Sequence, residues 1–136
     1  MRAINAIIVH MAYTTPSMDI GVAEIDQWHR QRGWNGIGYH LVIRRDGTVE
    51  NGRPLDQEGA HTKGANADSI GICLVGGKHP SKDAAEVNFT SAQWRALDRV
   101  CRDLLLDYPG AQISGHRDWA ATHCPGFNVL EWARTL

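Results

Sequence analysis

Two continuous apolar runs constrain the fold of this chain more than any other feature. Residues 6–10 (AIIVH) and 69–75 (SIGICLV) are short, contain β-branched side chains and are bounded by polar or glycine-containing segments. This pattern is typical of β-strands that are buried on both faces, as in sheets that helices cover. The sequence therefore predicts an α/β fold with a central mixed β-sheet flanked by helices.

Two helices are marked by the residues that begin or end them. Asp19 can cap a helix over residues 22–32, and Gly33 ends it because glycine adopts a positive φ without strain. Residues 90–93 (TSAQ) form a capping box that opens the clearest helix of the chain, which runs to about residue 107. Its apolar residues recur at helical spacing, so one of its faces is expected to pack against the sheet.

The remaining elements are short. Residues 38–43 and 48–50 flank an Asp-Gly turn, which is a signal of a β-hairpin. The other expected elements are an ordered loop over residues 52–67, a surface loop over residues 78–88, a short strand over residues 112–114 and a final helix capped by Asn128. With no repeat and no linker, we expect one domain over residues 1–136.

Composition excludes several classes of function. The hydrophobic fraction of 43% and the charged fraction of 21% are those of an ordinary globular domain. A net charge of −1 gives no electrostatic footprint for nucleic acid or for a membrane surface. No apolar run approaches the roughly 20 residues that span a bilayer. The first residues lack the apolar core and cleavage site of a secretory signal, so we expect synthesis in the cytoplasm.

The three cysteines differ in their surroundings. Their odd number and the absence of a CxxC pair argue against a disulfide framework. Cys73 lies in an apolar run and Cys101 on an apolar helical face, so both are interpreted as small buried hydrophobes. Only Cys124 lies among polar and turn residues, eight positions after His116 in residues 115–127 (GHRDWAATHCPGF).

A third residue could join this pair in a metal site. His10 ends the first apolar run, and His116 follows the short strand expected over residues 112–114. Both therefore lie at strand ends, where open α/β sheets collect ligands. Two histidines and Cys124 would fill three positions of a tetrahedral zinc site and leave the fourth for water, which suits amide hydrolysis. The alternative is a buried core histidine and a structural free cysteine. The spacing alone favours this alternative, because it contains no local zinc motif.

Other residues allow other interpretations. Cys124 could be a thiol nucleophile with His116 as its base, although Pro125 removes a backbone N–H that would help to form an oxyanion hole. Tyr39 could bring a phenol to the same end of the sheet or be a half-buried strand residue. His61 lies in a loop, where it is equally well explained as solvated. His29 and His79 fit surface positions.

Three segments carry a resemblance to a known family. IIVH, GYHLVIRRDGTVENGRPLDQEGAHTKGANADSIGICLVGG and GHRDWAATHCPGF resemble the type 2 N-acetylmuramoyl-L-alanine amidases, which share a domain with the peptidoglycan recognition proteins. DIGVAEIDQWHRQRGW and NFTSAQWRAL are similar to the small phage endolysins of the T-seven lysozyme kind. The resemblance covers residues 6–132, and it implies the amidase and recognition-protein fold.

The resemblance implies a role for five residues. One zinc ion per chain would be held by His10, His116 and Cys124. Tyr39 matches a catalytic tyrosine that orients or activates the attacking water. Thr122 stands where the phage enzymes carry a lysine that stabilises the oxyanion, and its hydroxyl donates a weaker hydrogen bond than a cation does.

The resemblance also implies a substrate groove. His61 matches a histidine that lines the groove, and Lys63 and Asn66 belong to the same substrate-side loop. His123 is a further candidate for contacting substrate beside Thr122. Where the phage pattern after the first zinc histidine is Cys-Ser-Ala, this chain has residues 11–13 (MAY), so that wall of the groove is expected to differ.

The expected function is zinc-dependent hydrolysis of the amide bond between the lactyl group of N-acetylmuramic acid and L-alanine in peptidoglycan. A phage or prophage endolysin of this kind acts on periplasmic peptidoglycan after another protein has permeabilised the membrane. We expect a monomer that binds neither nucleic acid nor membrane. Binding to a phage RNA polymerase is not carried over, because the N-terminus is shorter than in the relative that has this property. The alternatives are a non-catalytic muropeptide-binding module and a cytosolic muropeptide-recycling amidase.

Overall fold

Parallel pairing on both sides of one strand builds the central sheet. In the computed structural model, which describes residues 2–136, the sheet has five strands in the order β3-β2-β4-β1-β5. The strands are β1 (Ala6–Met11), β2 (Leu41–Ile43), β3 (Val49–Asn51), β4 (Ser69–Leu74) and β5 (Gln112–Gly115). Only β3 is antiparallel to its neighbour, so the prediction of a mixed sheet is confirmed.

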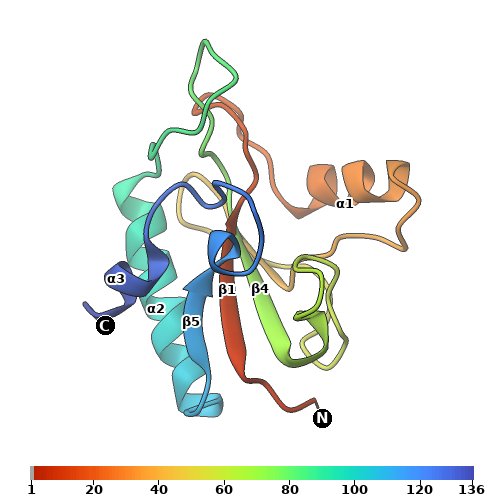
Figure 1. Cartoon of the computed structure of the whole chain (residues 1–136). Helices are drawn as coiled ribbons and strands as arrows, with labels where there is room; N and C mark the ends of the chain where they lie inside the picture. The colour runs from red at the N-terminus through yellow and green to blue at the C-terminus, as the bar shows by residue number, and fades with distance from the viewer. Residues whose placement is uncertain (1) are drawn as a thin grey trace.

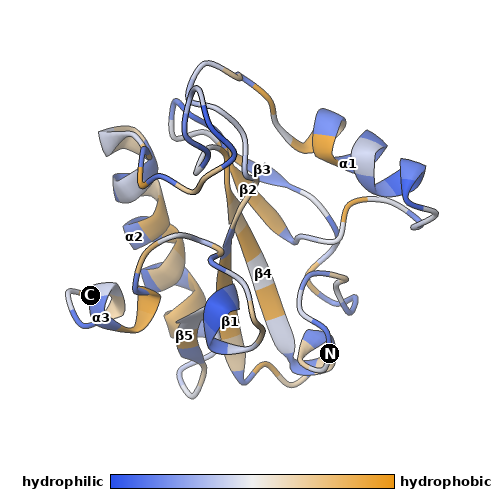
Figure 2. Cartoon of the chain, turned by 45° about the horizontal axis from the view of Figure 1, so that its top comes forward, coloured by the Kyte–Doolittle hydropathy of each residue, from blue (hydrophilic) through white to orange (hydrophobic). Residues whose placement is uncertain are grey.

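Helices cover both faces of the sheet. They are α1 (Val22–Gln31), α2 (Ser91–Asp107) and α3 (Val129–Ala133), and two 3-10 turns cover Asn66–Asp68 and His116–Asp118. Figure 1 shows α2 and α3 beside β5 and α1 on the opposite side of the sheet. Figure 2 shows that the strands are mostly hydrophobic and the connecting loops mostly hydrophilic. Within residues 2–136, no helix has the length and apolar character needed to cross a membrane.

The two faces of β1 have different neighbours. Ile7 and Val9 point into the main core, which contains the buried face of α2. Successive side chains of a strand alternate between faces, so Ala6, Ile8 and His10 point to the other face. Ala6 and Ile8 pack there with Ala65, which lies in the loop that precedes β4. His10 is therefore directed toward the side of the sheet that α1 and this loop cover.

Several predicted boundaries are confirmed. Thr90 and Gln93 form the capping box at the start of α2, and Asn128 caps α3. Gly33, just beyond α1, has a φ of 90°. The hairpin turn is closed by a hydrogen bond from the Arg44 N–H to the carbonyl oxygen of Thr48.

Two predictions around α1 were wrong. Gly21, not Asp19, is the N-cap, and its N–H donates to the carboxylate of Glu24, whereas Asp19 forms an ion pair with Arg44. His29 was expected at the surface, but it is buried and its Nδ1 accepts a hydrogen bond from the Gly38 N–H at 2.9 Å. The sequence could not show that residues 36–38 fold back over this face of α1.

The strand expected to begin at residue 38 begins at Leu41. Gly38 instead pairs with the loop before β4, and its carbonyl oxygen accepts a hydrogen bond from the Ala60 N–H. A Cβ atom at Gly38 would lie 2.1 Å from the carbonyl oxygen of Ala60, so only glycine allows this approach. This contact holds Tyr39 where the loop and the sheet meet.

Gln93 should be among the most sensitive positions for stability. Its buried amide donates to the carbonyl oxygens of Ile43 and Val75, and its amide oxygen accepts from the N–H of Thr90. We expect Gln93→Leu to reduce the free energy of unfolding by about 3 kcal/mol, because it leaves several buried backbone groups without partners. Urea unfolding would measure this loss, with Arg99→Ala on the exposed face of α2 as the control. A loss as small as that of the control would contradict the prediction.

Acid should destabilise the fold in part through His29. Burial, followed by the nearby charges of Arg32 and Arg53, lowers the pKa of His29 to about 4. As the pH falls, His29 therefore becomes protonated in the unfolded chain before it does so in the folded chain. The stability that the neutral His29 contributes is present above about pH 6.5 and is lost as pH falls toward about 4. In metal-free protein, the free energy of unfolding should fall less between about pH 7 and about pH 5 in His29→Gln than in the wild type. Equal losses in the two proteins would refute this role.

Candidate metal centre and active site

The register of the sheet brings two histidines together at the carboxyl ends of β1 and β5. Val9 of β1 is paired with Gly115 of β5, so His10 and His116 continue side by side from neighbouring parallel strands. Their ring centroids are 4.6 Å apart. His10 is almost completely buried, with 1% of its surface exposed, whereas His116 is half-buried. Burial lowers the pKa of both imidazoles, and for His10 the charges of His61 and His116 add to this effect.

The loop after β5 returns Cys124 to the same point. The carbonyl oxygen of Cys124 accepts a hydrogen bond from the Arg117 N–H at 2.7 Å, which closes the loop. Its Sγ accepts a hydrogen bond from the N–H of Met11, the residue after His10, at 3.2 Å. Sγ lies 3.9 Å from Nδ1 of His10. The predicted group of His10, His116 and Cys124 is therefore assembled from two distant parts of the chain, the end of β1 and the loop after β5.

This group has the chemistry of a metal site. One ligand atom from each residue can be chosen so that all three lie within 4.8 Å of one another. Three donors around a tetrahedral metal ion would be about 3.5 Å apart, so small side-chain movements suffice. The neutral imidazoles favoured by burial are the form that binds metal, and sulfur with nitrogen donors suits a borderline or soft ion.

Burial does not favour Cys124 as a free nucleophile. It raises the pKa of the thiol to about 11, against the smaller lowering effect of the hydrogen bond from Met11. The nucleophile in such a mechanism is the thiolate, which this environment disfavours at neutral pH unless a cation is present. The geometry thus supports a ligand more than a nucleophile with His116 as its base.

The ring of Tyr39 lies between His10 and α1. The two ring centroids are 5.0 Å apart, and the Tyr39 ring also packs against His29 of α1. The pKa of the phenol is raised well above its usual value by burial first and by the nearby thiols of Cys73 and Cys124 next. Tyr39 is therefore a neutral hydrogen-bond donor next to the candidate ligands.

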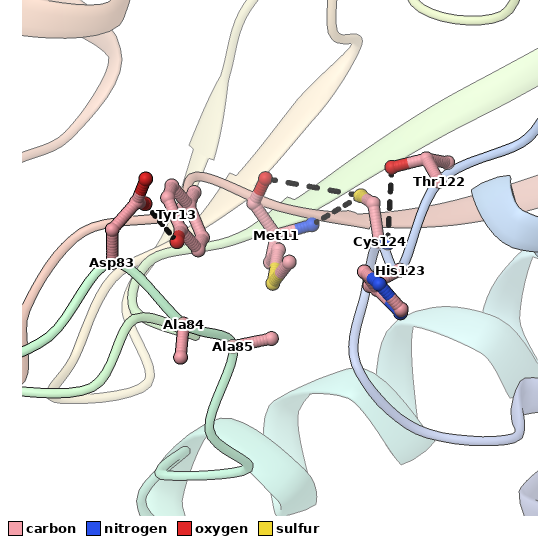
Figure 3. A pocket seen from close by; sticks show the side chains of 8 residues that line it. All are labelled: Met11, Tyr13, Asp83, Ala84, Ala85, Thr122, His123 and Cys124. Atoms are coloured by element: carbon pink, nitrogen blue, oxygen red, sulfur yellow. Dashed lines mark hydrogen bonds between the residues drawn. The ribbon is translucent and has the colours of Figure 1, made fainter.

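A cavity of about 640 Å³ opens beside the cysteine. Thr122, His123 and Cys124 form one side of it, as Figure 3 shows. Oγ1 of Thr122 accepts a hydrogen bond from the Cys124 N–H at 3.3 Å. The hydroxyl proton of Thr122 is then available for a further acceptor in the cavity.

Only one half of the opposite wall of the cavity was predicted. The hydroxyl of Tyr13 donates a hydrogen bond to Asp83, whose loop also supplies Ala84 and Ala85 to the cavity (Figure 3). Tyr13 has a φ of 59°, and Nζ of Lys78 lies 5.4 Å from the centre of its ring. The departure at residues 11–13 pointed to this wall, but nothing in the sequence marked the loop over residues 78–88 as its second half.

The predicted substrate-side loop has a different arrangement. His61 is buried and its Nδ1 lies 2.9 Å from Nε2 of His10. Burial, with smaller effects of neighbouring cationic groups, lowers its pKa to about 3. The amide oxygen of Asn66 accepts hydrogen bonds from the N–H groups of His61 and Thr62, and Lys63 is exposed. None of these residues lines the cavity beside Cys124, and their contact with substrate stays a prediction.

Comparisons with known proteins find related sequences and a related fold. The family model described as N-acetylmuramoyl-L-alanine amidase matches residues 1–127. The chain is 48% identical to the endolysin of Klebsiella phage KP32 and 46% identical to that of Escherichia phage T7, in each case over 94% of this chain and 84% of the relative. The solved structure of N-acetylmuramoyl-L-alanine amidase LysC from Clostridium intestinale is similar with a TM-score of 0.80 and 32% identity, over 97% of this chain and 83% of that one.

Proposed function

The chain belongs to the N-acetylmuramoyl-L-alanine amidase family, and from this premise we propose that it is a zinc-dependent phage endolysin. As a member of this family it is an amide hydrolase. The bond cleaved would be the amide between the lactyl group of N-acetylmuramic acid and L-alanine in peptidoglycan. The observation that carries the proposal is the convergence of His10, His116 and Cys124 beside an open cavity.

The same three residues would hold one zinc ion per chain. Two nitrogen donors and one sulfur donor leave a position for water or substrate in a tetrahedral site, as catalytic zinc sites require. When bound, zinc supplies a Lewis acid that polarises the scissile carbonyl and activates water. The N–H of Met11 would continue to donate to the sulfur of Cys124 and so stabilise its thiolate form.

Two further side chains would act on the reacting groups. Tyr39 stays protonated, so it can orient the attacking water through a hydrogen bond and pass on a proton as the reaction proceeds. Thr122 can donate its hydroxyl proton to the oxyanion that forms at the carbonyl oxygen. His123 lines the same side of the cavity and is proposed as a substrate contact, as are Lys63 and Asn66 from the resemblance.

The cavity would receive the substrate on the side of the cysteine. Its far wall combines the ring of Tyr13 with the methyl groups of Ala84 and Ala85, while Thr122 and His123 supply polar contacts. A mixed surface of this kind suits a lactyl-peptide, which has methyl groups and amides close together. Cys124 would complete the metal site, so the enzyme is favoured over a non-catalytic muropeptide-binding module.

We further propose the setting implied by the phage relatives. The protein would act as a monomer on periplasmic peptidoglycan, after another protein has permeabilised the membrane. A cytosolic amidase for muropeptide recycling would carry out the same reaction on soluble fragments. Intact sacculi and soluble muropeptides therefore distinguish these two settings.

The activity itself can be tested with purified sacculi. We expect the protein to release free L-alanine N-termini and to leave unsubstituted lactyl groups on the glycan, which mass spectrometry of the products would identify. A chelator should abolish the release, and added zinc should restore it. Cleavage of soluble muropeptides alone would support recycling, and no cleavage of either substrate would refute the amidase.

Cys124→Ser should remove both the metal and the activity. A hydroxyl is a much poorer zinc ligand than a thiolate, so we expect the zinc content to fall close to zero and turnover to fall by at least about a hundredfold. Cys101→Ala is the matched control, because Cys101 is a buried cysteine within α2 and is not part of the ligand group. Full activity of Cys124→Ser at an unchanged zinc content would contradict the ligand assignment.

Variants at Thr122 test the oxyanion role. Thr122→Val keeps the shape of the side chain but removes the hydroxyl, both as a donor and as the acceptor of the Cys124 N–H, so kcat should fall by about ten- to a hundredfold with little change in KM. Thr122→Lys should give a higher kcat than Thr122→Val, because a cation donates a stronger hydrogen bond to an oxyanion. Steady-state kinetics would measure both. If all three side chains give the same turnover, Thr122 is not the oxyanion donor.

A further inference from the structure

The two nitrogens of the His10 ring face different partners. Nδ1 is directed toward Sγ of Cys124 at 3.9 Å, where the metal would be held. Nε2 is directed into the protein, toward Nδ1 of His61 at 2.9 Å and Oγ1 of Thr62 at 3.2 Å. A contact behind a ligand ring is where metal-binding histidines usually have an orienting partner.

The fold provides a defined place for the His61 ring. A Cβ atom at Gly71 in β4 would lie 2.5 Å from this ring, and one at Gly59 would lie 2.6 Å from it. Only residues without a side chain leave room for the imidazole at these two points. The amide oxygen of Asn66 also holds the backbone N–H groups of His61 and Thr62. Ring and backbone are therefore both fixed.

The shortest contact of His10, the one to His61, fits one arrangement of protons. If Nδ1 of His10 is the ligand, Nε2 carries the proton and must donate it. His61 then accepts at Nδ1, and its own proton lies on Nε2. That nitrogen lies 3.3 Å from Oγ of Ser69, which can accept it. Each nitrogen thus has a partner of the matching type.

We propose that His61 is a positioning residue for the metal centre, which fixes the ring orientation and tautomer of His10, and not a residue of the substrate groove. The proposal rests on the proposed function, because it assigns His61 a role through the ligand His10. His61 has 9% of its surface exposed and does not line the cavity beside Cys124. A side chain in this place can act on the ligand but has little surface with which to contact substrate.

The two roles predict different measurements. A positioning residue acts on zinc affinity and on kcat, whereas a groove residue acts mainly on KM and leaves zinc affinity unchanged. His61→Leu removes the acceptor behind His10 and still fills the place above Gly71. His61→Asn keeps an acceptor close to the position of Nδ1 and serves as the conservative variant.

The experiment measures zinc affinity by competition with a chromophoric chelator in the full-length protein. We expect His61→Leu to weaken zinc binding by about ten- to a hundredfold, and His61→Asn to restore most of the loss. Thr62 remains as a second acceptor in His61→Leu, so the double variant with Thr62→Val should bind zinc more weakly still. Ser69→Ala is the matched control, because the Ser69 hydroxyl contacts Nε2 of His61 and not the nitrogen that faces His10. It should lose less zinc affinity than His61→Leu does.

Cobalt-substituted protein gives a readout of the ligand geometry. The visible spectrum should change in His61→Leu and return toward that of the wild type in His61→Asn. Thermal unfolding of the metal-free variants identifies any general loss of stability. If His61→Leu is destabilised, the zinc affinity of His61→Asn relative to that of the wild type is the comparison that tests the proposal. Zinc affinity equal to that of the wild type, together with a raised KM, would overturn the proposal in favour of a groove contact. Failure of the wild type to bind zinc would instead refute the proposed function.

Discussion

The parallel pairing of β1 with both β4 and β5 is the constraint on which the rest of the site depends. It places His10 one position beyond the Val9–Gly115 pair, so the residue after β5 becomes its neighbour. The same pairing leaves the N–H of Met11 free of the ladder with β5, and this group binds Sγ of Cys124. One strand therefore supplies one candidate ligand, adjoins the second candidate and anchors the third.

Side chains alternate between the two faces of β1, so the residues that form the core and the candidate ligand lie on opposite faces. The side chains of Ile7 and Val9 complete the core under α2, whereas His10 faces the loop before β4. On β4, the absence of a side chain at Gly71 makes room for the His61 ring behind His10, the candidate ligand. Burial on this face also keeps the imidazoles neutral, since desolvation disfavours their charged forms. The packing that stabilises the sheet thus prepares the donors for a metal ion.

Local patterns predicted the parts of the fold that depend on local physics. The apolar runs, the capping box at Thr90 and the positive φ of Gly33 are properties of a few neighbouring residues, and the structure has all three. The burial of His29 and the contact between Tyr13 and Asp83 depend on segments that meet only after folding. The candidate metal site lies between these two cases. Its residues were marked by their types and by the family resemblance, but the contacts behind the ligands were not.

Thr122 illustrates how the ligand loop and the reaction are connected. A hydroxyl can accept one hydrogen bond and donate another, and here it accepts from the N–H of Cys124. A lysine at this position has only donors, so it could stabilise an oxyanion more strongly but could not accept from that N–H. Compared with a lysine, the threonine therefore gives up electrostatic strength and gains a contact that fixes Cys124, the candidate metal ligand two residues away. In this chain the group proposed to meet the oxyanion is also part of the structure that holds Cys124 in place.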